Sequence, residues 1–462
     1  MSLKTTVIAA VVLAALAAYI YKYEREPVDT DGDSEREEVF DFEAEKIQDI
    51  QIRRPGGDGL QLRKDGESWK IVQPVSAPAS ETEADSLTRN IATLERERVV
   101  VEGDEVNLSE FGLAEPKLEV QFTTEGAEGP TTLLLGDKTP TGTNLYAKLA
   151  SEKRIFVIPS YLESNFDKEA WDLRDRTILH FERDEVEKVV LRRPDGELVL
   201  ARAAEDRWNV ATPSFCRADR YRASGLVSQL ETGKMEEIVS EQGGDLSEYG
   251  LDRPRYEVEI QLRGGKTATL LVGGEKDGRY YARNPDRSLV YLVGSSLVDE
   301  IKKDASGYRS KRLFDYSTYQ VNKFQIEPAG EAARTYQKVE EEEEDQWKQI
   351  APDSSRELDR TKVEDLLYKM NGTDAEDFAD DAPSTLEPYD LDSPAFTITV
   401  WSKEGASVEE LAVGKPEGEW VYARRKGDEP VMKLPASKWE EIEKLMSFEE
   451  TEKETGERDE EK

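Results

Sequence analysis

The residues best suited to covalent or metal chemistry are scarce in this chain of 462 residues. It contains one cysteine, Cys216, and one histidine, His180. The common zinc sites take three or four ligands, mainly from these two residue types, so two such residues are too few. A Cys–His nucleophilic pair needs only two residues, but neither SFCRADR nor TILHFER carries a catalytic signature. We therefore interpret Cys216 as a small buried thiol and His180 as a partly exposed ring, and we expect no intrachain disulfide, no metal and no cofactor.

The sequence also lacks a complete phosphate-binding loop motif. The segment GGEKDGRY at 273–280 has glycines at the spacing of a phosphate-binding loop, but Arg279-Tyr280 replaces the required Lys-Ser/Thr pair. The 63 basic and 99 acidic residues give a net charge of −36. Such a chain repels phosphate backbones, so we expect no nucleic-acid partner. With so many carboxylates, a carboxylate-dependent hydrolase stays an alternative, although no pair is singled out by its spacing.

Two further groups of residues are candidates for a binding surface. The tyrosines Tyr146, Tyr281 and Tyr422 recur in matched Tyr-Ala pairs and could line a groove. The arginines Arg174 and Arg309 recur in LRDRTILHF and YRSKRLFDY. The structural interpretation, in which these arginines form ion pairs between units, is favoured because long side chains commonly cover the edge of a core.

A threefold repeat supplies the elements that must position these residues. Trp69, Trp208 and Trp347 are spaced by 139 residues each time. A second landmark reads LSEFGLAEP at 108–116, LSEYGLDRP at 246–254 and LEPYDLDSP at 386–394. Self-similarity at a fixed period predicts tandem structural units.

Within a unit the pattern predicts strands in pairs and a helix. VEKVVLRR at 186–193 and ELVLARA at 197–203 read as a hairpin around the turn PDG. The helix that follows has its apolar residues at positions i, i+3, i+4 and i+7, which is one helical face. These residues are Ala223, Leu226, Val227 and Leu230 in the second unit, and Val363, Leu366, Leu367 and Met370 in the third.

The second landmark reads as a helix stop followed by a strand. Gly112, Gly250 and Asp390 fall where a Schellman cap needs a left-handed residue, which glycine adopts without strain and aspartate tolerates. Pro116, Pro254 and Pro394 then prevent the helix from resuming. Strict alternation of apolar and polar residues follows each proline, which is typical of a half-buried strand.

The front of the chain predicts a membrane anchor. No residue from Thr5 to Tyr21 is charged, and Tyr19, Tyr21 and Tyr23 crowd one end. The alternatives are a cleaved signal peptide, with Ala15-Leu16-Ala17 as the cleavage site, and a buried helix. We expect residues 1–23 to form a single transmembrane helix, with the remainder of the chain on the extracytoplasmic side of the cytoplasmic membrane.

The repeat and the front end together predict the domain organisation. An acidic linker is expected at 24–38, three repeat units at 39–175, 176–311 and 312–447, and a charged tail at 448–462. The predicted fold class is α+β, with three tandem homologous units of antiparallel sheet with packed helices.

The launch motif L-x-x-[FY]-G-L-x-x-P, the strands that end in glycine, the YA[RK] strands and the junction DLRDRTILHF at 172–181 resemble the bacterial domain of unknown function 4340 family. The resemblance covers about 400 residues, and the third unit departs from the pattern at Asp390 and at the glutamate run before Trp347. It implies an N-terminal membrane helix and a setting beside ABC-type transporters, and it supplies no catalytic residues.

Three functions therefore remain open from the sequence. The first is a non-enzymatic, membrane-anchored interaction or accessory protein with a protein partner, such as a transporter component. The second is a periplasmic glycan- or peptide-binding protein, and the third is a carboxylate-dependent hydrolase.

Overall fold

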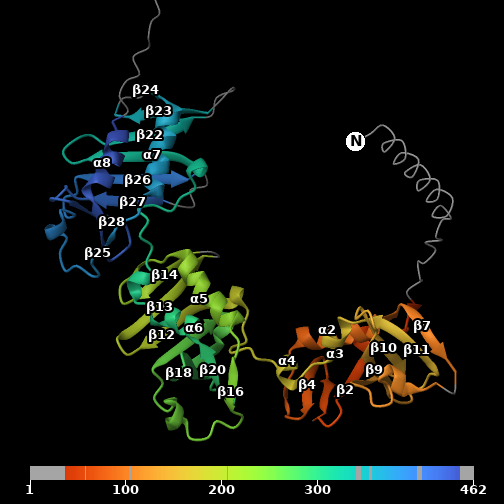
Figure 1. The fold of residues 1–462 in the computed structure, drawn as a ribbon. Helices are drawn as coiled ribbons and strands as arrows, with labels where there is room; N and C mark the ends of the chain where they lie inside the picture. The colour runs from red at the N-terminus through yellow and green to blue at the C-terminus, as the bar shows by residue number, and fades with distance from the viewer. Residues whose placement is uncertain are drawn as a thin grey trace, which may run out of the picture. The chain divides into compact units, whose positions relative to one another are not determined.

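The computed structural model describes residues 37–447, except for positions 58, 104–105, 205–206, 340–344, 353–355 and 403–407. The chain divides into two compact units, Met1–Arg176 and Thr177–Lys462 (Figure 1). The first unit contains the first repeat, and the second unit contains the other two. The expected membrane helix at 1–23, most of the expected linker at 24–38 and the expected tail at 448–462 lie outside the described residues.

Each repeat folds into one nine-stranded antiparallel sheet. In the second repeat the spatial order is β15-β14-β13-β12-β17-β18-β19-β20-β16. Two meanders therefore meet at a central pair, β12 with β17, and β16, which precedes β17 in the chain, forms the edge beyond β20. The first and third repeats have the same order with their own strands, which is the architectural meaning of the repeat.

The strand bounds are as follows. In the first repeat they are β2 Ile47–Arg53, β3 Leu60–Asp65, β4 Ser68–Gln73, β5 Ala77–Pro78, β7 Arg98–Glu102, β8 Leu118–Thr124, β9 Thr131–Lys138, β10 Asn144–Leu149 and β11 Arg154–Pro159. A separate two-stranded pair joins β1 Glu37–Glu38 to β6 Glu95–Arg96. In the second repeat they are β12 Val186–Arg193, β13 Gly196–Ala204, β14 Arg207–Thr212, β15 Cys216–Arg217, β16 Glu237–Ser240, β17 Tyr256–Leu262, β18 Thr267–Lys276, β19 Arg279–Arg283 and β20 Val290–Gly294. In the third they are β21 Val321–Pro328, β22 Arg334–Val339, β23 Gln346–Ala351, β24 Arg356–Leu358, β25 Asp377–Asp380, β26 Phe396–Ser402, β27 Val408–Val413, β28 Trp420–Arg425 and β29 Val431–Pro435.

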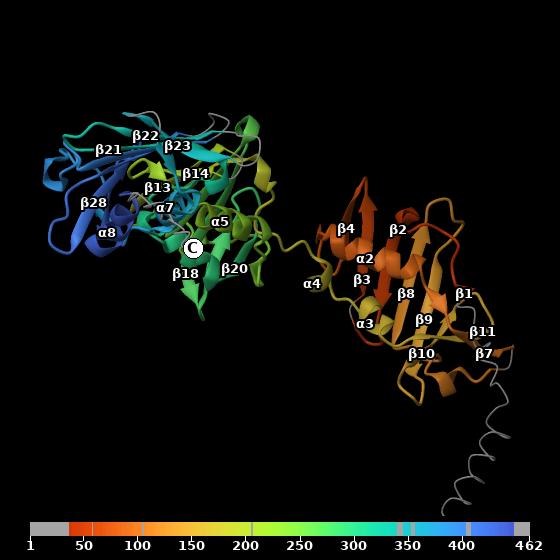
Figure 2. The ribbon, with the colours of Figure 1, turned by 90° about the horizontal axis from the view of Figure 1, so that it is seen from above.

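Each sheet carries helices on one face. The α-helices are α2 Glu81–Ala92, α3 Leu162–Phe166 and α4 Ala170–Leu173 in the first repeat, α5 Arg220–Thr232 and α6 Ser295–Lys302 in the second, and α7 Arg360–Gly372 and α8 Ala436–Leu445 in the third. Figures 1 and 2 show α2 lying across its own sheet. Every repeat thus has two layers, helix on sheet, around one apolar core.

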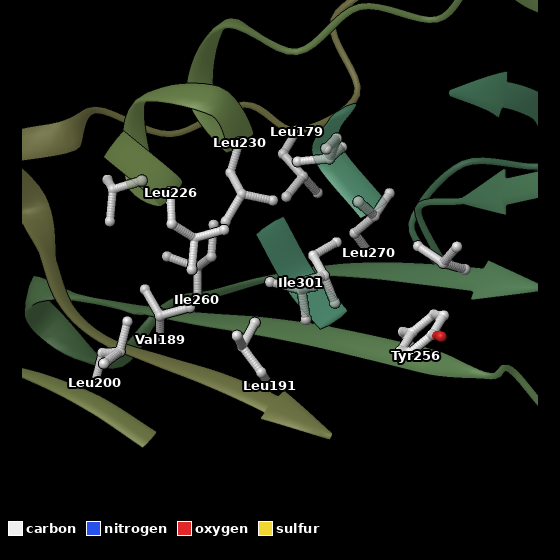
Figure 3. Packing of buried hydrophobic residues seen from close by; sticks show 14 of the residues in the cluster. Leu179, Val189, Leu191, Leu200, Leu226, Leu230, Tyr256, Ile260, Leu270 and Ile301 are labelled. Carbon is white, nitrogen blue, oxygen red and sulfur yellow. The ribbon is translucent and has the colours of Figure 1, made fainter. Parts of the chain in front are cut away.

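The core of the second repeat shows why the predicted helical face forms. Leu226 and Leu230 of α5 point toward Val189, Leu200 and Ile260 of the sheet (Figure 3). All four residues of the predicted face are fully buried. Burying aliphatic side chains of this size stabilises the fold by about 1.5–3 kcal/mol each.

Most of the predicted elements are confirmed. The hairpin strand predicted at 186–193 matches β12, and its partner predicted at 197–203 lies inside β13. The three tandem antiparallel units are present, but strands dominate the described residues more than the prediction of an α+β class implied. The difference arises because every sheet gains short edge strands, such as β15 and β16, whose sequences carry too few residues for a clear alternating pattern.

No helix in the described part of the chain combines the length and the apolar character needed to cross a bilayer.

Candidate functional site

The second landmark of the repeat forms the same corner three times. Gly112, Gly250 and Asp390 have φ angles of 66°, 65° and 53°, all in the left-handed region. The preceding turns are 3₁₀ helices, η2 Leu108–Phe111, η4 Leu246–Tyr249 and η8 Glu387–Tyr389. We call each turn, together with the strand glycine that faces it, a repeat corner.

The hydrogen bonds of the corners are those of a Schellman cap. The Leu251 amide donates to the Leu246 carbonyl at 2.9 Å, and the Gly250 amide donates to the Ser247 carbonyl at 3.2 Å. The equivalent Leu113–Leu108 and Leu391–Leu386 bonds measure 2.9 and 3.2 Å. Strands β8, β17 and β26 begin two residues after Pro116, Pro254 and Pro394. The described geometry therefore gives these six motif positions an architectural role.

The glycine that closes each apolar strand has a steric reason. A Cβ atom on Gly273 would lie 2.2 Å from the carbonyl oxygen of Tyr249. The equivalent distances are 2.2 Å from Gly136 to the Phe111 oxygen and 2.4 Å from Gly414 to the Tyr389 oxygen. Only glycine lets the strand backbone approach the capped turn this closely.

The recurring tyrosines belong to the same corners. Tyr146 packs against Phe111, Tyr281 against Tyr249, and Tyr422 against Tyr389, with ring centroids 5.0, 5.1 and 5.2 Å apart. Aromatic pairs at this separation stabilise a fold by about 0.5–1.5 kcal/mol. The aromatic position of the motif and the Tyr-Ala strand are therefore two halves of one contact, a relation that their regular spacing in the sequence could have suggested.

The cysteine and the histidine lie in contrasting environments. Cys216 is fully buried, and burial raises the pKa of its thiol to about 12. The thiol is therefore protonated at neutral pH and a poor nucleophile. His180 is exposed, where a partly exposed ring was expected.

The two recurring arginines are both buried at the ends of their repeats. Arg174 forms an isolated bridge with Ala79, and Arg309 forms the equivalent bridge with Ala218. The Arg309 guanidinium donates to Asp381 and, at 2.7 Å, to the Ser214 hydroxyl, and it lies 5.2 Å from the Phe378 ring centre. Burial opposes its charge, but the hydrogen bond and the charge of Asp381 outweigh burial and raise the pKa of Arg309.

Arg309 is one part of a larger contact that joins the second and third repeats inside the Thr177–Lys462 unit. We call this contact the inter-repeat clamp; its members are Arg217, Arg309, Asp381, Glu409, Arg425 and Asp428. Buried Arg425 donates to Asp428 at 2.6 Å and to the Ser310 carbonyl at 3.0 Å. The Arg217 amide donates to Asp428 at 3.2 Å, and its guanidinium lies 3.1 Å from Glu409. Within the clamp, Arg309 of the second repeat and Asp381 of the third form an ion pair across the junction of the two repeats.

A cleft opens beside this clamp. One hollow of about 440 Å³ lies between the first turn of α5 and the segment 306–312. A second hollow of about 330 Å³ lies over β14. Ala218, Arg220 and Asp315 line both hollows, so they form one continuous cleft. We call it the cationic cleft.

The cleft is rich in positive charge. Its cations are Arg207, Arg217, Arg220, Arg222, Arg309, Lys311 and Arg312, whereas its carboxylates are Asp219, Asp315 and Asp374. Asp219 is already used as the cap of α5, because it accepts from the amides of Tyr221 and Arg222. Arg207 and Arg222 are exposed, and neither forms an ion pair with a carboxylate of the described residues. A net positive cleft in a chain of charge −36 is a local reversal of charge.

The cleft is not predicted by the sequence pattern, although one signal of it is present. Arg220 and Arg222 occupy the first turn of α5, where the helix dipole disfavours cations. The equivalent turn of α2 carries Glu81 and Glu83, the favoured charges. Only folding brings this turn close to Lys311 and Arg312, which lie about ninety positions further along.

No cluster of three or more potential metal ligands occurs among the residues whose placement is described. The arrangement as a whole can hold an anion, and its cations provide no evident nucleophile or general base.

Comparison with known proteins agrees with the repeat. A search of curated proteins found no matching relative. The family model described as "Domain of unknown function (DUF4340)" matches residues 69–215, 208–358 and 347–449. Each match begins at one of the tryptophans of the repeat, so the first two cross the junction from one sheet to the next. Because the matches together cover most of the chain, the protein belongs to the DUF4340 family and carries three tandem copies of its domain.

Proposed function

We propose that this protein is a non-enzymatic binding protein that contacts its partner through the cationic cleft. The observation that carries the proposal is the concentration of arginine and lysine side chains around two joined hollows in an otherwise acidic chain. Arginine is the cation best suited to such a role, because its planar fork binds carboxylate and phosphate groups through two hydrogen bonds.

The surroundings of the cleft support binding without chemistry. The Cys216 thiol beside the clamp has a pKa raised to about 12 by burial. The Asp428 and Glu409 side chains are only 11% and 10% exposed, and they are paired with Arg425 and Arg217. The carboxylate-dependent hydrolase therefore gains no support from the thiol or from these carboxylates.

The proposed setting does not come from the structure. The uncharged segment Thr5 to Tyr21 is proposed to anchor the chain, with the repeats on the extracytoplasmic side. A transporter component as partner is what the family resemblance implies. The full-length protein should stay with membranes through a carbonate wash, and deletion of residues 1–24 should release it. Release of the full-length chain by the wash would contradict the anchor.

A periplasmic peptide-binding protein is the second candidate, and the same cleft favours it. The two candidates differ in whether the bound segment belongs to a neighbouring membrane protein or to a free ligand. The glycan-binding form of this candidate depended on an aromatic groove, but Tyr146, Tyr281 and Tyr422 each pack within their own repeat corner.

Complementation of a deletion strain tests the proposal. The double variant Arg220→Glu/Arg222→Glu reverses two exposed cleft charges and should fail to complement at matched protein levels. The control Lys266→Glu/Lys415→Glu changes the net charge by the same amount. Its two positions are exposed, lie in the second and third repeats, and do not line the cleft. Full complementation by the cleft variant would overturn the proposal.

A further inference from the structure

Deepening the proposed function on which it rests, we infer that the cationic cleft binds an acidic peptide segment, with several Asp or Glu side chains, from another protein. The form of the cleft indicates an extended ligand. Cations line both hollows, and Arg220 lies where they meet. A single small anion would engage only one hollow, whereas an extended peptide places carboxylates at about 7 Å intervals along one side.

The cleft cations are held in two ways. Arg309 and Arg217 form ion pairs with Asp381 and Glu409 of the third repeat. The Nε of Arg309 and one terminal nitrogen of Arg217 are buried without a hydrogen-bond partner among the described residues. Each of these two nitrogens keeps an unused hydrogen-bond donor, but both guanidinium charges are paired with a carboxylate. The net positive charge of the cleft therefore comes from its other cations.

The exposed cations form the rim. Arg220 lies over the ring of Tyr221, 4.8 Å from its centre, and donates to the Tyr221 hydroxyl at 2.9 Å. This stacking holds the guanidinium of Arg220 in place at the mouth of the cleft. Arg222 and Arg207 complete the rim on either side, one in each hollow.

The aromatic residues of the cleft favour a peptide over a carboxylated sugar. Sugar sites commonly offer an open aromatic face for the ring to stack on. Trp208 is buried, with the Arg202 guanidinium 4.7 Å from its ring centre, and one face of Tyr221 is covered by Arg220. Long polyanions such as nucleic acid are disfavoured, because the acidic surface outside the cleft repels whatever extends beyond it.

The amides of the α5 N-terminus are not the proposed binding groups. Asp219 already accepts from the Tyr221 and Arg222 amides, at 2.9 and 3.1 Å. Recognition therefore depends on side chains, which makes it accessible to charge-reversal mutagenesis.

Fluorescence anisotropy of a labelled oligoglutamate peptide tests the inference. A peptide of about eight residues spans about 27 Å when extended. It should bind the purified full chain, and its affinity should fall as salt rises from about 50 to about 300 mM, because screening weakens each ion pair. A peptide of the same length with alternating Glu and Lys should not bind.

The cleft variants give the decisive comparison. Arg220→Glu/Arg222→Glu should weaken oligoglutamate binding about tenfold or more, since an exposed ion pair contributes up to about 1 kcal/mol and two are reversed. Arg220→Lys/Arg222→Lys should retain part of the affinity, and Lys266→Glu/Lys415→Glu should bind like the unaltered chain. The cleft variant should not have a lower Tm, because its new acids suit the helix dipole, so lost binding cannot be attributed to unfolding.

Three results would overturn the inference. One is oligoglutamate binding that Arg220→Glu/Arg222→Glu leaves unchanged, and another is no binding at the lower salt concentration. The third is cleft-dependent binding of an oligogalacturonate with no binding of oligoglutamate, which would assign the cleft to a carboxylated sugar. If the cleft variant also fails to complement the deletion strain, the proposed function stands and only the ligand class is wrong.

Discussion

The repeat corners and the cationic cleft differ in how the chain builds them. A corner is made from one short stretch and one facing strand, and it occurs three times with nearly the same angles and contacts. The cleft combines residues of the second and third repeats, and its first-turn arginines have acidic counterparts in the first repeat. Features that recur in all three repeats are explained by folding, whereas the exposed rim arginines Arg207 and Arg222 form no ion pair with a carboxylate of the described residues.

The first helical turn of the third repeat differs from that of the second in how its cations are paired. Its helix α7 also begins with cations, Arg360 and Lys362. Arg360 is paired with Glu364 on the next turn at 2.7 Å, a common stabilising arrangement on a helix surface. Arg222 in α5 has no such carboxylate among the described residues, so its charge is available to a ligand.

The largest loss of stability is expected from a substitution in the inter-repeat clamp beside the cleft. Arg425→Met leaves Asp428 buried without its guanidinium partner, which should lower the free energy of unfolding by about 3–5 kcal/mol. Lys426→Met is the matched control, because the neighbouring Lys426 side chain is 70% exposed and forms only a surface pair with Glu410. Urea denaturation measures both, and equal losses would contradict the clamp.

The next largest effect is expected from a substitution that disrupts a repeat corner. Gly273→Ala places a Cβ 2.2 Å from the Tyr249 oxygen, so the strand or the turn must shift, at a cost of about 2–3 kcal/mol. Gly274→Ala should be tolerated, since its nearest contact is at 3.5 Å. Thermal unfolding of the two neighbouring variants should separate them clearly; similar Tm values would show that the corner is looser than described.

A smaller effect concerns the left-handed residue itself. Gly250→Ala should destabilise the protein by about 1 kcal/mol, and valine at this position should cost more. Asp390→Gly should be neutral or slightly stabilising, because Asp390 has a left-handed backbone that aspartate tolerates and glycine adopts without strain. If Gly250→Val unfolded at the same urea concentration as the unaltered chain, the cap would not be needed.

The smallest effect has the opposite sign. Arg220→Glu/Arg222→Glu should raise the free energy of unfolding by about 0.5 kcal/mol, because acids in the first turn of a helix interact favourably with its dipole. A binding-deficient variant that is more stable than the parent is expected of residues retained for function. A clear loss of stability would instead assign these arginines to the fold.

The corners could be predicted from the sequence because their determinants are local. The left-handed position, the leucine pair of the cap and the proline all fall within nine residues, and the same spacing is seen three times. The short helical turn predicted before the cap is a 3₁₀ turn in each repeat. The facing glycine and tyrosine were recognised as landmarks, but their contact with the turn needed the tertiary structure.

The cleft could not be predicted in the same way. It depends on placing Arg220 and Arg222 beside Lys311 and Arg312, and on the clamp through Arg425 of another repeat. These residues are far apart in the chain, and in a sequence with 63 basic residues no spacing marks them out. Arg309 was identified because it recurs with Arg174, but its partner Asp381 was not.

Hydrogen exchange of the full chain with and without oligoglutamate tests most directly the claim that the corners are scaffold and the cleft is the contact site. The account predicts slower exchange on peptide binding at 217–222 and 306–312, and unchanged exchange at 108–113, 246–251 and 386–391. Protection confined to the repeat corners, or no protection at the cleft under conditions where the peptide binds, would contradict it.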